Sequence, residues 1–93
     1  MGIVFNDLKL DNIIVGDAKN SVNSLTEIRL IDFGLCTKYL DSKGNHIKFS
    51  KTNDFTGNLA LSSKYAMNFD TVSRRDDLIS LTYLLIYMID GNL

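Results

Sequence analysis

The chain of 93 residues predicts a small α+β fold, with a short β ribbon, a long irregular segment and one central helix. Two observations indicate the ribbon: residues 12–16 and 27–34 are short runs rich in Ile, Leu and Val, and each ends in glycine. Such runs, bounded by turn residues, are typical of strands. The third observation is an apolar stretch at residues 78–89, preceded by residues that can begin a helix. A chain of this length holds one small domain at most.

The two predicted strands should pair as a hairpin-like ribbon. Residues 17–26 between them are polar and small, which indicates a loop. Residues 35–68 show no sustained hydrophobic period and contain Gly44, Gly57 and many Ser, Thr and Asn residues. Segments of that length without regular structure are usually functional or disordered, so we expect an irregular segment here.

The last part of the chain predicts a helix from about residue 76 to residue 89. Ser73 can cap its start, with Asp76 three residues later in the spacing of a capping box. Asp76 and Asp77 favour a helix N-terminus through the helix dipole, and Gly91 suits the C-terminal end. The helix is apolar nearly all round, which predicts burial on most faces within the larger fold that we expect around it, and partial exposure in this chain alone. Its expected core positions are Leu78, Leu81, Leu85 and Met88.

Charge and composition narrow the class of protein. Apolar residues make up 45% of the chain, enough for a core, and 10 Lys and Arg nearly balance 11 Asp and Glu. This balance predicts no surface for nucleic acid or for acidic membranes. The longest apolar run has twelve residues, whereas a membrane-spanning helix needs about 20. The start lacks the pattern of a signal peptide, so we expect an intracellular location, cytoplasmic or nuclear. The oligomeric state stays open.

Several single residues have structural interpretations. Cys36 is the one cysteine, which excludes an internal disulfide and fits a reducing compartment. We expect it to be a small packed residue, because nothing nearby in the sequence would activate its thiol. Arg74 and Arg75 are interpreted as a structural or surface pair. His46, in a loop rich in Gly and Asn, is expected to be exposed and inert.

Four polar side chains indicate a shared chemistry. Asp7 and Asn12 stand in the cluster D-L-K-L-D-N directly before the first predicted strand, and Asp32 stands at the end of the second. Oxygen atoms of carboxylates and amides are the ligands that Mg²⁺ prefers, together with phosphate and water. Lys9 adds a cation near Asp7, whose carboxylate can orient a hydroxyl and accept its proton. This set suits phosphoryl transfer, so we expect Asp7, Asn12 and Asp32 to converge on one open face.

Residues 7–12 resemble the catalytic loop of eukaryotic protein kinases, H-R-D-L-K-x-x-N, and residues 32–34 resemble their D-F-G motif. The runs F-T-G-N at residues 55–58 and S-R-R-D-D-L-I-S-L at residues 73–81 narrow the resemblance. It is then to the casein kinase I family of serine/threonine kinases, or to its vaccinia-related neighbours. The resemblance implies that residues 1–93 are a partial protein kinase domain, the middle of the C-terminal lobe, without the N-terminal lobe and the later helices.

The resemblance also implies roles for the four polar residues. Asp7 matches the catalytic base, and Lys9 matches the lysine that neutralises the transferring phosphate. Asn12 and Asp32 match the two ligands of the Mg²⁺ ions that accompany ATP. The implied activity is transfer of the γ-phosphate of ATP to a hydroxyl of a protein substrate.

Four further residues match structural positions of the family. Asp77 matches the aspartate that opens the central helix and holds the catalytic loop by its backbone amides. Phe5 and Phe33 match two stacked positions of an apolar spine, and Gly34 completes the D-F-G motif.

The chain also departs from the family pattern. Phe5 replaces the usual His, and Asn6 replaces the usual Arg, whose guanidinium would bind a phosphate on the activation loop. Leu10 stands where the family often has Pro, and Ala60 stands where casein kinase I enzymes commonly have Arg. Preference for phosphate-primed or acidic substrates, a trait of that family, is therefore not implied here. The Gly-rich loop and strand lysine of the N-terminal lobe are not in the sequence, so we expect the isolated chain to be inactive.

Two other functions stay open. One is a pseudokinase-like binding module or a truncated gene product without catalytic activity. The other is a kinase-like small-molecule phosphotransferase. Lys9, two residues after Asp7, and Gly34, after Asp32 and Phe33, argue against the small-molecule enzyme.

Overall fold

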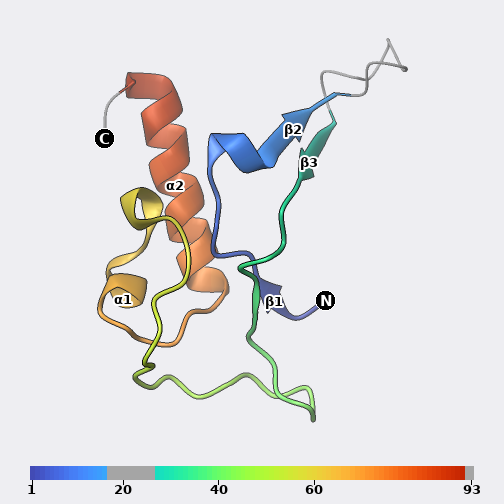
Figure 1. Cartoon of the computed structure of the whole chain (residues 1–93), viewed down its shortest axis with the longest axis vertical. Helices are drawn as coiled ribbons and strands as arrows, with labels where there is room; N and C mark the ends of the chain where they lie inside the picture. The colour runs from blue at the N-terminus through green and yellow to red at the C-terminus, as the bar shows by residue number, and fades with distance from the viewer. Residues whose placement is uncertain (17–26, 92–93) are drawn as a thin grey trace.

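The computed structural model describes residues 1–16 and 27–91 (Figure 1). The predicted loop at residues 17–26 lies outside the described residues. The described part is an α+β arrangement of two small antiparallel sheets and one main helix, so the predicted α+β class is confirmed. Its elements are β1 (Ile3–Val4), β2 (Ile13–Val15), β3 (Ile28–Leu30), β4 (Thr37–Lys38), α1 (Lys64–Met67) and α2 (Arg74–Asp90), with 3-10 turns at Leu10–Asn12 and Leu59–Leu61.

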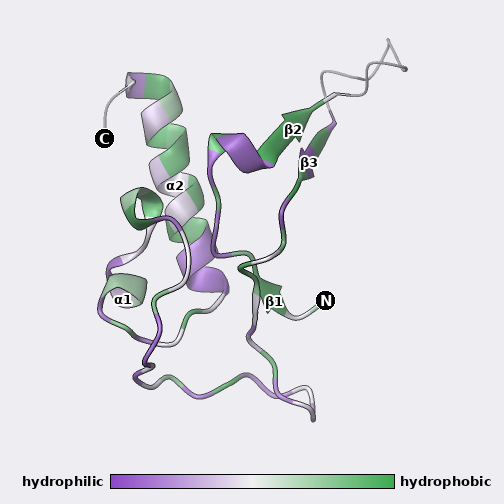
Figure 2. Cartoon of the chain, in the orientation of Figure 1, coloured by the Kyte–Doolittle hydropathy of each residue, from purple (hydrophilic) through white to green (hydrophobic). Residues whose placement is uncertain are grey.

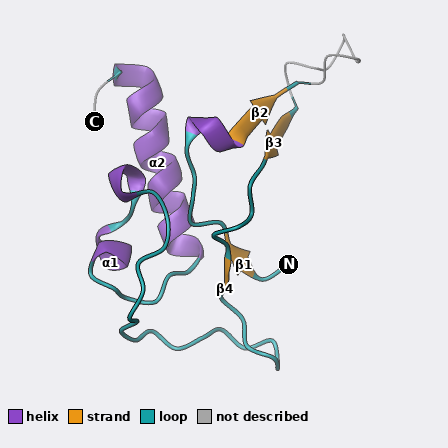
Figure 3. Ribbon diagram, in the orientation of Figure 1, coloured by secondary structure: helices purple, strands orange, loops and turns teal. Residues whose placement is uncertain are grey.

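The predicted ribbon is present, but both of its strands are shorter than expected. β2 pairs antiparallel with β3, in the register of Ile14 opposite Arg29 (Figure 3). The first strand was predicted to begin at Asn12, which instead ends a 3-10 turn. The second was predicted to run to residue 34, but Asp32 has a φ of 63°, in the left-handed region, where a strand cannot continue. The strand prediction was therefore wrong for residues 31–34.

The expectation of an irregular segment at residues 35–68 was wrong in part. β4 forms there because it pairs with β1, with Val4 opposite Thr37. The turn Leu59–Leu61 is capped by Asn58, whose side chain accepts the Ala60 amide at 3.0 Å. Ser63 caps α1 by accepting the amide of its third residue at 3.1 Å. These elements have two to four residues each, too few to show a period in the sequence.

The long helix α2 begins and ends close to the predicted positions. The Ser73 amide donates to the Asp76 carboxylate at 2.8 Å, as the capping-box spacing predicted. Gly91 ends the helix with a φ of 77° and donates its amide to the Tyr87 carbonyl at 2.7 Å. A glycine adopts this left-handed conformation without steric cost, which explains why the helix stops there.

α2 is partly exposed in this chain, as expected, but the residues that were expected to face the core are not the buried ones. Its buried residues are Asp76, Ser80 and Leu84. The four expected core positions are exposed instead, with relative accessibilities of 63% for Leu78, 39% for Leu81, 48% for Leu85 and 59% for Met88. Figure 2 shows hydrophobic residues along α2 beyond its hydrophilic first turn. A helix that is apolar nearly all round gives no signal for the side that packs, and here the packed side is largely polar.

The apolar core is small and lies where α2 meets β1 and the segment before α1. Its buried hydrophobic residues are Val4, Phe5, Leu61, Ala66 and Leu84. In the described part of the chain, no helix is both long enough and apolar enough to cross a bilayer.

Candidate functional site

The loop that follows β1 is fixed from α2 by one carboxylate. Asp77 accepts the backbone amide of Phe5 at 2.7 Å and that of Asn6 at 3.0 Å. These residues lie more than 70 positions apart in the sequence, so the two bonds join the N-terminal part of the chain to the first turn of α2. This is the contact that the kinase resemblance implies for Asp77. Hydrogen bonds to a charged acceptor are stronger than neutral ones, so the start of the loop is held firmly.

Asp7 and Asn12 are brought into direct contact inside the loop. The Asn12 side-chain nitrogen donates to the Asp7 backbone carbonyl and to its carboxylate Oδ2, both at 2.9 Å. Both residues are buried, with 6% of Asp7 and 4% of Asn12 accessible. The pair of bonds fixes the direction of the Asp7 carboxylate. Neither bond uses the amide oxygen of Asn12, which is the atom that a cation would need.

Lys9 lies at the outer edge of this pair. Its ammonium nitrogen is 3.9 Å from the Asp7 carboxylate Oδ1, and its side chain is 38% exposed, against 9% for Asp7. An ion pair of this length with one exposed partner contributes little to stability. The Lys9 charge therefore remains available to an anion that approaches Asp7.

Asp32 is connected to the loop through the backbone of Ile31, the residue before it. The Ile31 amide donates to the Asn12 carbonyl at 3.0 Å, which extends the contact between the strands beyond β2 and β3. Asp32 itself is exposed, and its carboxylate Oδ1 accepts the Gly34 amide at 3.3 Å. A shared cation between Asp32, Asn12 and Asp7 stays a prediction.

Two phenylalanines connect the segment after β3 to the loop. The ring of Phe5, which is buried, meets the ring of Phe33 edge to face, with centroids 5.3 Å apart. Phe33 is 51% exposed. Edge-to-face pairs of this kind contribute about 0.5–1.5 kcal/mol beyond burial. The contact matches the stacked positions that the resemblance implies.

The candidate site offers few side chains that could bind a metal ion. Within residues 1–16 and 27–91, no group of three or more His, Cys, Asp or Glu side chains is placed to hold a cation. Mg²⁺ needs only one or two protein carboxylates when phosphate and water complete its shell. Asp32 and Asn12 therefore fit the donor chemistry of Mg²⁺, while ATP and Mg²⁺ themselves belong to the proposed function.

Cys36 is partly buried, in agreement with the expectation of a packed residue. Burial raises the pKa of its thiol, and the carboxylates of Asp77 and Asp32 raise this pKa further. A raised pKa lowers the fraction of thiolate, which is the reactive form. The thiol is therefore not suited to nucleophilic chemistry.

The other residues with structural interpretations lie as follows. The Arg75 guanidinium lies 3.8 Å from the centroid of the Tyr65 ring and 3.0 Å from the Asp76 carboxylate. Arg74 lies over the Tyr39 ring at 4.8 Å. His46 is exposed, as expected. The arginine pair is thus structural, as interpreted from the sequence.

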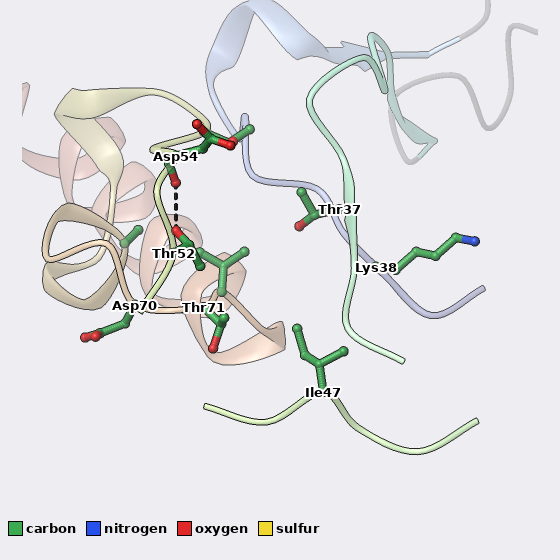
Figure 4. Close-up of a pocket in the computed structure, with 10 residues that line it drawn as sticks. Thr37, Lys38, Ile47, Thr52, Asp54, Asp70 and Thr71 are labelled. Carbon is green, nitrogen blue, oxygen red and sulfur yellow. Dashed lines mark hydrogen bonds between the residues drawn. The ribbon is translucent and has the colours of Figure 1, made fainter. Parts of the chain in front are cut away.

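Two pockets lie near these elements. One, of about 220 Å³, lies between β4 and the segment before α2 and is lined by polar residues such as Thr37, Thr71 and Asp70 (Figure 4). No candidate catalytic residue of the described chain lines it. A second pocket, of about 300 Å³, has Lys9, Ala60 and Tyr87 in its wall. The second lies beside Lys9 of the candidate site.

Some residues that build the site were not identified from the sequence. The side-chain nitrogen of Asn6 donates to the Leu35 carbonyl and the Thr37 hydroxyl, both at 2.9 Å. Ser63 donates its hydroxyl to Asp76, and Ser80 donates to the Leu61 carbonyl at 2.7 Å. Serines before a short helix and inside an apolar helix are weak signals alone, because their partners are distant in the sequence.

Comparison with known proteins supports a kinase-like interpretation. The chain is 38% identical, over 94 aligned residues, to the rice protein named casein kinase 1-like protein HD16 (Oryza sativa subsp. japonica). The alignment covers 99% of this chain, which spans only 13% of the length of that relative. No family model matches the chain. The similarity supports a kinase-like segment, and the α+β arrangement is consistent with part of a kinase C-terminal lobe.

Proposed function

We propose that this chain is the catalytic-loop part of a serine/threonine protein kinase of casein kinase I type. Such an enzyme transfers the γ-phosphate of ATP to hydroxyl groups of a protein substrate. The observation that carries the proposal is the buried Asp7 carboxylate, oriented by Asn12 in a loop that Asp77 holds. The similarity to the rice relative supports the same family.

Each residue has a proposed part in the transfer. Asp7 accepts a hydrogen bond from the substrate hydroxyl and then its proton, since its carboxylate is held in one direction. Lys9 lies beside Asp7 and neutralises charge on the transferring phosphate. Asn12 and Asp32 would hold Mg²⁺, which supplies charge neutralisation on the phosphates of bound ATP.

The substrate and the location follow from charge and cysteine use. Asn6 and Ala60 stand where arginines would read phosphate, so we propose a protein substrate that needs no prior phosphorylation. Asn6 should also make activity independent of phosphorylation on the activation segment, because an amide attracts phosphate far less than a guanidinium. The single cysteine fits a reducing compartment, so we place the activity in the cytoplasm or nucleus.

The function is tested in a chimera in which this chain replaces the aligned segment of the rice relative. Transfer of radiolabelled phosphate from ATP to casein is measured for the chimera, its Asp7→Asn variant and its Asp11→Asn variant. Asp7→Asn should lower the rate by at least about 100-fold, since general-base catalysis commonly contributes 10²–10⁴-fold. Asp11 is exposed in the same loop, so its variant should keep the rate. Equal rates for the chimera and Asp7→Asn would refute the role of Asp7.

The isolated 93 residues provide a second comparison. We expect no transfer above background, because positioning of ATP depends on parts of a kinase that this chain does not contain. An inactive chimera that still binds ATP would favour the alternative of a pseudokinase-like binding module. Transfer by the isolated chain would contradict the need for an N-terminal lobe.

A further inference from the structure

Asn6 connects three separate parts of the chain. Its backbone amide donates to Asp77 on α2. Its side chain donates to Leu35, which lies before β4, and to Thr37, which lies in β4. Its carbonyl oxygen faces Gly57 so closely that a Cβ at that glycine would collide with it. One small residue thus touches the helix, the segment after D-F-G and the turn at Gly57.

The Asn6 side chain uses its full donor capacity in these contacts. An amide nitrogen carries two hydrogens, and here one goes to the Leu35 carbonyl and the other to the Thr37 hydroxyl, each at 2.9 Å. The backbone of Asn6 has a φ of 70°, in the left-handed region, which Asn tolerates better than most residues. A longer side chain on this backbone would be strained and would not reproduce the two short bonds.

We propose that Asn6 is a positioning residue, which holds residues 35–37 against the candidate catalytic loop by an uncharged clamp of two hydrogen bonds. These two hydrogen bonds take the place of the attraction between an arginine and a phosphate on the activation segment. Residues 35–37 are therefore ordered without a phosphate. The clamp rests on the contacts of Asn6 alone. Its consequence, a catalytic segment that is ordered without phosphorylation, rests on the proposed kinase function.

The clamp predicts a specific signal in the nuclear magnetic resonance spectrum of the complete chain. Both side-chain amide protons of Asn6 should exchange slowly with solvent. In Thr37→Val, which keeps the shape of the side chain but loses the acceptor, one of them should exchange roughly fivefold faster, the factor for a typical hydrogen bond. Thr37→Ser restores the hydroxyl and should restore slow exchange.

A matched control separates this contact from a general effect of losing a hydroxyl. Thr52 lines the same pocket as Thr37, and its hydroxyl donates to the Asp54 carbonyl. Thr52→Val should leave the Asn6 protons unchanged. The amides of Cys36 and Tyr39, which bond to Phe33 and Gly2, report on order in the segment. In Asn6→Gly, which keeps the left-handed backbone, they should exchange roughly 25-fold faster, because the fivefold factors for two lost hydrogen bonds multiply.

The result that would overturn the clamp is unchanged exchange of both Asn6 protons in Thr37→Val. Exchange that accelerates in high salt would contradict its uncharged character, because salt weakens contacts between charges. Neither measurement uses ATP. The clamp can therefore fail while the proposed function holds, and the proposed function can fail while the clamp holds.

Discussion

Two adjacent carboxylates at the start of α2 serve different parts of the chain. Asp77 binds the backbone amides of the loop after β1, whereas Asp76 binds Ser63, the Ser73 amide and the Arg75 guanidinium. Successive helical residues point about 100° apart, so neighbouring side chains can reach two separate segments. The pair D-D thus determines how both segments sit on the helix.

The burial of Cys36 and the negative charges around it predict slow alkylation of its thiol. Because burial and the carboxylates of Asp77 and Asp32 raise the pKa of this thiol, the folded chain should be alkylated by iodoacetamide more slowly at pH 8 than the chain in urea. Asp32→Asn removes one of these charges and should speed the reaction, while Asp41→Asn, in a different turn, should not. Faster alkylation of the folded chain would contradict the raised pKa.

The same pKa shift has a defined sign for stability. The folded chain favours the neutral thiol of Cys36. The contribution of this thiol to stability is therefore fully present below the ordinary pKa of cysteine. It is lost as the pH rises through the raised value of the folded state.

The two glycines of residues 35–68 form a matched pair for substitution. Gly44 has a φ of 81° with no atom near the position of a Cβ, whereas Gly57 has a φ of 126° and faces the Asn6 carbonyl. Gly44→Ala should cost roughly 1–2 kcal/mol, the penalty of a left-handed backbone. Gly57→Ala adds a collision and should cost more. Urea unfolding of both variants measures the difference, and an equal or smaller loss for Gly57→Ala would show that the turn can move away.

At the scale of elements, α2 packs through a narrow strip. Leu84 is 2% exposed, whereas its neighbour Leu85 is 48% exposed. Leu84→Ala should therefore lower the free energy of unfolding by about 2–5 kcal/mol, through lost burial and a cavity. Leu85→Ala should change it by less than about 1 kcal/mol. Chemical denaturation of the two variants provides the check, and the reverse order would place the wrong face of α2 against the core.

The limits of each element show what sequence patterns can predict. Ser73, Asp76 and Gly91 act on the backbone within a few residues, so both ends of α2 could be read from the sequence. β4 exists only because β1 lies beside it, and two residues carry no period. The strand prediction extended too far because Asp32 adopts a left-handed backbone, which Asp tolerates better than most residues.

The sequence predicts which residues make up the candidate site, but only some of the hydrogen bonds between them. The motif around Asp7 named the correct neighbours, since Asn12 and Asp7 are close along the chain. The role of Asn6 could not be predicted, because the sequence shows the absence of an arginine and gives no sign of the bonds to Leu35 and Thr37. Such contacts depend on how distant segments are folded together.

At the scale of the whole molecule, exposed apolar side chains predict self-association. Leu78, Leu85, Met88 and Ile89 on α2 are each 48% to 88% exposed, and contiguous apolar surface of this kind favours association. Sedimentation velocity should show concentration-dependent oligomers, which the double variant Leu85→Lys, Met88→Lys should reduce. Ile28→Lys, on β3, is the control for added charge away from α2. A monodisperse monomer of the unmodified chain at high concentration would refute the prediction.

The polar contacts of α2 have a thermodynamic consequence. Asp76, Asp77 and Ser80 join the helix to its neighbours, while only five hydrophobic side chains of the described chain are buried. The heat capacity of unfolding rises with exposure of apolar surface and falls with exposure of polar surface. This chain should therefore unfold with a heat-capacity change per residue below that of ordinary domains, so its stability should vary gently with temperature and respond weakly to cooling.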